Sequence, residues 1–120
     1  MNDYKLTEAE TKFAEIIWTN APLKSSWLVK LCETELNWKK STTYTMLKRL
    51  EDKGIFQNEN GVVSARVEKE DFYAMQSRQF VAETFDGSLP RFVAAFTRRK
   101  KLSEKEIEEL QQLIDAHRGE

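Results

Sequence analysis

Hydrophobic residues recur three and four positions apart in three segments of the first half of the chain, which is the period of an amphipathic α-helix. In the first segment, Thr7 and Glu10 have the spacing of a capping box, and Pro22 follows the last apolar residue. In the second segment, Ser25 or Ser26 is the expected cap. Three helices are therefore predicted, over about residues 8–18, from one of these serines to near Asn37, and from Lys39 or Ser41 to Gly54.

The pattern changes to that of β-strands after Gly54. Residues 55–57 and 62–67 are short segments rich in β-branched and aromatic side chains, and Asn60-Gly61 between them is a strong signal for a hairpin turn. The first 70 residues are therefore expected to form three helices followed by a hairpin.

Helical spacing returns at Asp71, breaks at Asp86-Gly87-Ser88 and Pro90, and then resumes twice. The last helix is expected to begin at Ser103, where a second capping box occurs. The boundary lies near residue 70, so we predict a head over residues 1–70 and a helical tail over residues 71–120. The predicted fold class is mainly α with a small β-hairpin.

Composition limits the classes of function. The net charge of −1 gives no overall attraction to nucleic acid, so such a function requires a local patch. Cys32 has no cysteine partner and His117 is the only histidine, so no disulfide, metal site or cofactor is expected. No segment has the pattern of a signal peptide or approaches the roughly 18 apolar residues of a membrane span, so we expect a cytoplasmic protein without a membrane partner.

The third predicted helix has two different faces. Helical spacing places Thr43, Met46, Leu47 and Leu50 on the buried face. Hydroxyls and cations lie on the other face, and both bind phosphate oxygens. These residues are Ser41, Thr42, Tyr44, Thr45, Lys48 and Arg49. Residues 39–53 contain five basic and two acidic side chains, a charge pattern that fits a solvated helix face equally well. The order of helices and hairpin is that of a winged helix-turn-helix, which favours DNA binding.

This segment resembles a known family signature. The matching pattern is Trp38-x-x-x-Thr42-x-x-Thr45-Met46-Leu47-x-Arg49-Leu50-x-x-Lys53-Gly54. It is similar to the recognition helix of the penicillinase and methicillin-resistance repressors and their copper-responsive relatives, the BlaI/MecI/CopY family. Further matching pieces are Leu6-Thr7-x-Ala9-Glu10, Ile17-Trp18, Phe85-Asp86-Gly87-Ser88-Leu89 and Leu102-Ser103-x-x-x-Ile107-x-x-Leu110. The resemblance covers nearly the whole chain.

The resemblance implies a bacterial, homodimeric transcriptional repressor, of the kind that regulates antibiotic resistance, bound to palindromic double-stranded operator DNA. The DNA-binding residues would be Lys40, Ser41, Thr42, Tyr44, Thr45, Lys48 and Arg49. The tail would form the dimer, and the apolar stripes of its helices favour association independently of the resemblance. The dimerisation residues would be Phe80, Phe85, Leu89, Phe92, Val93, Phe96, Ile107, Leu110, Leu113 and Ile114.

Several positions depart from the family pattern. Thr43 stands where a branched aliphatic residue is usual, and Val62 stands on a shortened wing where an arginine is common. No cysteine follows Cys32, which excludes the thiolate copper site of the copper-responsive branch. The β-lactam-responsive branch is inactivated by a protease that cuts before a phenylalanine. The corresponding bond here is Ala95-Phe96, with alanine in place of that branch's asparagine.

Two other classes of function fit the sequence less well. An enzyme is not expected, because no set of residues forms a catalytic constellation. A winged helix that binds protein without specific DNA binding is the stronger alternative. Such a module would have an apolar or acidic exposed face on its third helix. The exposed face of this helix, called its front below, is polar to cationic. Derepression would follow from loss of tail dimerisation, with a regulatory protease as one candidate cause.

Overall fold

A computed structural model describes residues 3–119, which form two compact units that divide between Gln79 and Phe80. The first unit extends beyond residue 70 because the first half of the following helix packs on it. The assignment of residues 1–70 to DNA binding and of 71–120 to dimerisation stays a prediction. Residues 1–2 and 120 of these ranges lie outside the described residues.

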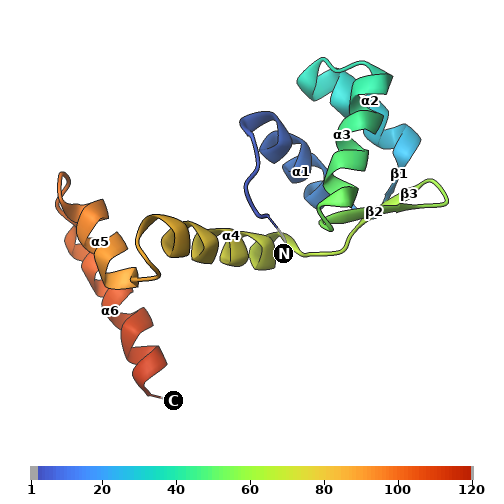
Figure 1. Ribbon diagram of the computed structural model, residues 1–120. Coiled ribbons are helices and arrows are strands. Elements are labelled where there is room, and N and C mark those ends of the chain that lie inside the picture. The colour runs from blue at the N-terminus through green and yellow to red at the C-terminus, as the bar shows by residue number, and fades with distance from the viewer. Residues whose placement is uncertain (1–2, 120) are drawn as a thin grey trace. The chain divides into compact units, whose positions relative to one another are not determined.

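The first unit contains three helices, a three-stranded antiparallel sheet and the start of a fourth helix (Figure 1). The elements are α1 (Glu8–Asn20), β1 (Leu23–Lys24), α2 (Ser25–Leu36), α3 (Lys40–Asp52), β2 (Phe56–Glu59), β3 (Val62–Ala65) and α4 (Lys69–Thr84). The strand order is β1-β3-β2. The predicted fold class, mainly α with a small hairpin, is confirmed. Strand β1 was not predicted, since two residues are too short to show alternation.

Helix termini follow the local signals in α1 but not in α2. Thr7 Oγ1 accepts from the Glu10 N–H at 3.1 Å, and Thr7 N–H donates to Glu10 Oε1 at 2.8 Å, which confirms the capping box. The prediction that Ser25 or Ser26 caps α2 is wrong. The cap residue is Lys24, and the Ser25 N–H donates to the Gly61 carbonyl at 2.8 Å, so the hairpin turn takes the place of a capping side chain.

The β2–β3 hairpin, called the wing below, turns at Asn60 and Gly61. Their φ angles are 53° and 80°, the pair of positive values that the tightest hairpin turn requires. The strands are Phe56–Glu59 and Val62–Ala65 instead of the predicted 55–57 and 62–67. The second strand ends early because the N–H groups of residues 66 and 67 both donate to the carbonyl of residue 55, which turns the chain out of the ladder.

The core of the first unit collects side chains from every element. Its largest fully buried members are Phe13, Phe56, Phe72, Ile17, Leu28, Leu47, Leu50, Ile55 and Val63. Trp18 packs between Phe56 and Phe72, with ring centroids 5.2 and 5.5 Å away, and its Nε1–H donates to the Val67 carbonyl at 3.0 Å. Burial on this scale is the main stabilising contribution to the unit, and it includes the first half of α4.

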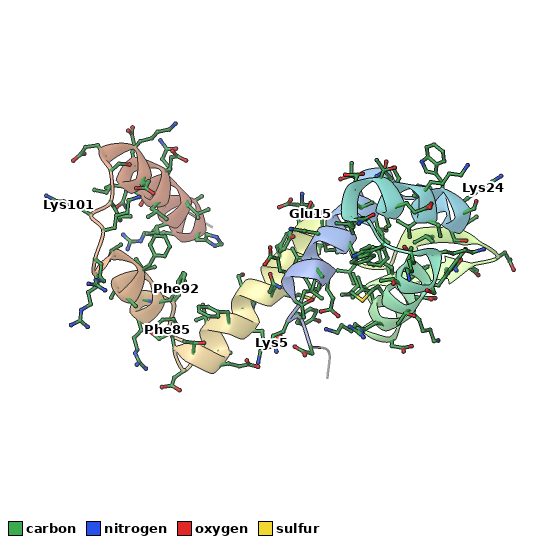
Figure 2. The ribbon with its side chains drawn as sticks, turned by 90° about the horizontal axis from the view of Figure 1, so that it is seen from above. Lys5, Glu15, Lys24, Phe85, Phe92 and Lys101 are labelled. Atoms are coloured by element: carbon green, nitrogen blue, oxygen red, sulfur yellow. The ribbon has the colours of Figure 1, made fainter. Side chains whose placement is uncertain are left out.

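A polar cluster also attaches α4 to α1. Glu15, which is labelled in Figure 2, accepts a 2.6 Å hydrogen bond from the Tyr73 hydroxyl and lies 2.8 Å from Lys69 Nζ. These two contacts, with Lys69 the stronger, hold the pKa of Glu15 below its ordinary value. Burial, with the Glu15 carboxylate as the second cause, raises the pKa of Tyr73 to about 12. The phenol therefore remains a hydrogen-bond donor at neutral pH.

The second unit comprises the end of α4, α5 (Leu89–Thr97) and α6 (Glu104–Arg118). The capping box at Ser103 is confirmed: its hydroxyl accepts from the Glu106 N–H at 3.1 Å. Pro90 was expected to break the helix, but it lies in the first turn of α5. Proline is tolerated there, because the N–H it lacks would have no helical partner.

Within residues 3–119, no helix is long and apolar enough to span a membrane. The same residues contain no group of three or more His, Cys, Asp or Glu side chains placed to hold a metal ion.

Candidate nucleic-acid interface

Helix α3 is buried along one side and exposed along the other. Thr43, Met46, Leu47 and Leu50 are buried, as helical spacing predicted. The predicted DNA-binding residues, apart from Tyr44, are exposed: Lys40, Ser41, Thr42, Thr45, Lys48 and Arg49. The arrangement leaves hydroxyl groups near the start of the helix and cationic groups along it, available to an anionic partner.

Within the described residues, the N-terminal end of α3 has neither a capping side chain nor an acidic residue in its first turn. Its cap residue is Lys39, no side chain hydrogen-bonds to this cap within the described chain, and the first turn contains no acidic residue. Helices α1 and α6, in contrast, have capping boxes and glutamates in their first turns. The free N–H groups and the positive end of the helix dipole therefore remain available to an external anion such as phosphate.

Tyr44 differs from the other candidates because it is half-buried against the core. Its hydroxyl donates to Ser25 Oγ at 3.2 Å, which connects α3 to the first residue of α2. The ring therefore contributes to the packing between the two helices as well as to the exposed surface. Sequence spacing identified its position on the helix but not this partner.

The cations on the front of α3 are partly balanced by local carboxylates. Lys48 Nζ lies 3.5 Å from Asp52 Oδ1, one turn further along, with the two side chains 72% and 67% exposed. Such a pair contributes at most about 1 kcal/mol and is screened by salt, so Lys48 can readily exchange Asp52 for a phosphate.

Arg49 contacts α1, and sequence analysis missed its partner. Its Nη1 lies 3.8 Å from Glu10 Oε2, and Lys53 Nζ lies 3.8 Å from Glu10 Oε1. Arg49 therefore braces α3 against α1, while half of its side chain stays exposed. The sequence signal for Glu10 was its place in the capping box, which gave no indication of these contacts across the fold.

The wing offers little positive charge. Glu59 is its only charged residue, and Val62 is exposed. Lys24 of β1 lies beside the wing, where it pairs with Val62 in the sheet, and on α2 Lys30 Nζ lies 6.0 Å from the exposed Trp27 ring. The sequence analysis did not single out Lys24, Trp27 or Lys30. The signal was the absence of acidic residues between Ala21 and Cys32.

The second unit carries the predicted dimerisation residues. Phe80, Phe85, Phe92 and Phe96 form a chain of ring contacts with centroids 5.6 to 6.0 Å apart, and Figure 2 shows Phe85 and Phe92 close together. Aromatic pairs at these separations contribute about 0.5–1.5 kcal/mol beyond their area. The cluster orders α5 against the end of α4, but it leaves Phe96 65% exposed.

Most of the apolar surface of the second unit remains uncovered. In the described part of the chain, neither α5 nor α6 contains a buried residue. The exposed hydrophobic residues here are Phe80, Leu89, Val93, Phe96, Ile107, Leu110, Leu113 and Ile114. An open cleft of about 530 Å³ between α5 and α6 is lined by Phe92, Val93, Phe96, Thr97, Leu102, Glu106, Glu109, Leu110 and Leu113. A continuous apolar surface of this kind is typical of a protein interface.

The Ala95-Phe96 bond lies inside α5, and both residues are exposed. A protease binds its substrate as an extended segment, so cleavage here requires local unfolding of α5. This short helix has no buried residue to resist such unfolding.

Three packed helices, a hairpin beside them and a polar, uncapped third helix define a winged helix-turn-helix protein. Comparison with known sequences identifies its family. The family pattern described as "Penicillinase repressor" matches residues 6–116, and the chain belongs to this family. Its members are bacterial transcriptional repressors and not enzymes, so both of these predictions are confirmed at the level of the family.

The chain is similar over nearly its full length to characterised members. It is 25% identical over 119 residues to the penicillinase repressor of Bacillus licheniformis, which covers 96% of this chain and 93% of that protein. It is 26% identical over 116 residues to the methicillin resistance regulatory protein MecI of Staphylococcus aureus strain Mu50, with 93% and 94% covered. The MecI protein of Mammaliicoccus sciuri is 25% identical with the same coverage.

Proposed function

We propose that this repressor binds a palindromic operator as a homodimer, with α3 of each copy in the major groove. The observation that carries the proposal is the two-sided character of α3. The helix is buried along Thr43, Met46, Leu47 and Leu50, and it exposes hydroxyls, cations and an uncapped N-terminus on the other side. A major groove admits a helix presented in this way.

The side chains divide by the contacts that they suit. Thr42 and Thr45 have short side chains that reach base edges, and Ser41 lies near the helix end, where phosphate binds. Lys40 and Lys48 supply charge to phosphates, to which Lys24 of β1 and Lys30 of α2 add theirs. Arg49 remains close enough to the front to meet phosphate while it braces α3 against α1.

Dimerisation is proposed through the second unit. The support is its uncovered apolar surface and its lack of a buried core in a single chain. A symmetric pair is the common solution for such a surface. Linking two heads makes the second binding event intramolecular, which raises operator affinity well above that of one head. Separation of the tails would then release the operator.

Cleavage of Ala95-Phe96 by a regulatory protease is the proposed route to that separation. It would remove five of the ten predicted dimerisation residues in one step. The proposal is checked by mass spectrometry of the repressor recovered from host cells exposed to a β-lactam. A fragment that begins at Phe96 supports it, and an intact chain during derepression rules it out.

The DNA-binding proposal is tested by selecting fragments of host genomic DNA with the purified protein. We expect recovery of inverted repeats whose half-sites lie a whole number of helical turns apart, as a two-fold symmetric dimer requires. Recovery of DNA without enriched repeats, at any salt concentration, would contradict the proposal and favour the protein-binding alternative. The genes next to the recovered sites would indicate which signal the repressor answers.

A further inference from the structure

Glu10 is a buried carboxylate that contacts the cationic end of α3. Its residue is only 3% exposed, although it lies in the first turn of α1. Its Oε1 accepts from the Thr7 N–H at 2.8 Å and lies 3.8 Å from Lys53 Nζ, and its Oε2 lies 3.8 Å from Arg49 Nη1. One carboxylate therefore joins the start of α1 to Arg49 of α3 and to Lys53, the residue that follows this helix.

Burial makes these contacts different from the exposed pair on the same helix. Lys48 and Asp52 are both in water, so either partner can leave without a large desolvation cost. Glu10 cannot regain its hydration without unfolding the start of α1, and a buried charge strongly retains its partners. Lys53 is further held by a 2.8 Å hydrogen bond from its Nζ to the Lys5 carbonyl.

The charge balance of the cluster follows from its members. Arg49 and Lys53 contribute two positive charges and Glu10 one negative charge, so the cluster has a net charge of about +1. Electrostatic attraction to phosphate is independent of sequence, and it increases with each cation that is free to displace counterions. A carboxylate that neutralises one cation therefore lowers binding to all DNA, including random DNA, while α3 keeps its position.

We propose that Glu10 is a positioning residue for operator recognition. It holds Arg49 and Lys53 against α1, which fixes the position of α3 and raises the ratio of operator binding to random binding. It also cancels part of their charge, which weakens binding to all DNA alike. This inference rests on the proposed function, because it assumes that the front of α3 meets DNA. No part of it depends on how the tails associate.

The test compares Glu10→Gln with Glu8→Gln in the full-length protein. Both changes remove one negative charge from the first turn of α1, and glutamine at position 10 still accepts from the Thr7 N–H. Glu8 is exposed and pairs with Lys12 at 3.5 Å, away from α3, so it is the matched control. Affinity is measured by fluorescence anisotropy for a random-sequence 30-base-pair duplex and for a selected genomic fragment, over a range of KCl concentrations.

For Glu10→Gln we expect tighter binding to the random duplex and a plot of log K against log salt that steepens by up to about 0.9 per head. The operator-to-random ratio should fall severalfold. Glu8→Gln should leave both quantities close to wild type. The double variant Glu10→Gln, Arg49→Gln restores the net charge of the cluster, so its salt slope should return toward the wild-type value. An unchanged slope and ratio in Glu10→Gln would overturn the inference.

Glu10→Asp separates charge from shape and covers the case in which the glutamine variant does not fold. It keeps the negative charge on a shorter side chain, so its salt slope should match wild type. The inference would also be overturned if the salt slope of Glu10→Asp were as steep as the slope expected when no carboxylate neutralises Arg49 or Lys53. Thermal unfolding by circular dichroism establishes which variants are folded. Failure of the wild-type protein to bind either duplex would instead contradict the proposed function.

Discussion

The hydroxyl of Tyr44 donates a 3.2 Å hydrogen bond to Ser25 Oγ, so the middle of α3 is tied to the first residue of α2. The same serine donates its N–H to Gly61 at the wing turn. Ser25 therefore lies at the junction of three elements: the recognition helix, the helix before it and the hairpin. The bond limits rotation of α3 about its axis, which would move Thr42 and Thr45 relative to a groove.

Tyr44→Phe keeps the ring and removes the bond. We expect the free energy of unfolding to fall by about 0.5–1.5 kcal/mol. Relative to wild type, affinity for the operator should fall more than affinity for random DNA, because the angle of α3 is less well defined. Ser25→Ala removes the same bond from its other end and should have the same effect on operator binding in a gel shift. Tyr44→Ala should narrow the gap between operator and random DNA further. Equal losses on both kinds of DNA would show that Tyr44 has no part in specificity.

Lys48 and Asp52 allow charge to be tested in both directions. Lys48→Ala should weaken binding to every sequence alike and reduce the salt slope by about 0.9 per head. Asp52→Asn frees Lys48 from its exposed partner and should steepen the slope, without a change in the operator-to-random ratio. Salt titration of binding to a random duplex measures both effects. An operator-selective loss in Lys48→Ala would instead assign Lys48 to base recognition.

Thr43→Val should stabilise the first unit. The Thr43 hydroxyl is buried, and the only partner recorded for it among the described residues is the Cys32 thiol, a weak hydrogen-bonding group. Valine has nearly the same shape. Removal of an unsatisfied buried polar group gains on the order of 1 kcal/mol, which corresponds to roughly 4–8 °C in melting temperature for a unit of this size. Differential scanning calorimetry measures the change. A lower melting temperature would indicate that the hydroxyl has a partner, such as a buried water.

Charge placed on the apolar surface of the second unit should separate the proposed dimer. Phe96→Asp or Leu113→Asp would bury an unpaired carboxylate, so we expect the dimer dissociation constant to rise on the order of 100-fold or more in analytical ultracentrifugation. Ala94→Asp adds the same charge to α5 outside the α5–α6 cleft and is the control. Truncation after residue 82 should give a folded monomer. Sedimentation of that fragment as a dimer would refute the assignment of the tail.

Tyr73 predicts a loss of stability at alkaline pH. Its pKa is raised from 10.0 to about 12 in the folded protein, so the neutral phenol favours the folded state. This contribution is complete below pH 10 and disappears as the pH rises toward about 12, because the unfolded state releases the proton first. Tyr73→Phe should be less stable than wild type at pH 8 in urea unfolding, and the difference should shrink between pH 10 and 12. A difference that is constant with pH would contradict the role of the phenol.

The elements whose signals are local were predictable. The capping boxes of α1 and α6 involve residues three positions apart, and the Asn60-Gly61 turn requires only the positive φ angles that these two residues adopt readily. The buried face of α3 followed from its spacing, because a helix that packs on a core must place its apolar residues every three or four positions.

The sequence by itself determined which residues form helices, where the hairpin turns and which side of α3 is free, since each of these depends on neighbours along the chain. Only the tertiary structure decided that the wing turn, and not a serine side chain, closes the start of α2, that Tyr44 bonds to Ser25, and that Glu10 contacts Arg49 and Lys53. These partners are 19 to 43 positions apart in the sequence and belong to separate elements. Their pairing is therefore set by how the helices pack around the core.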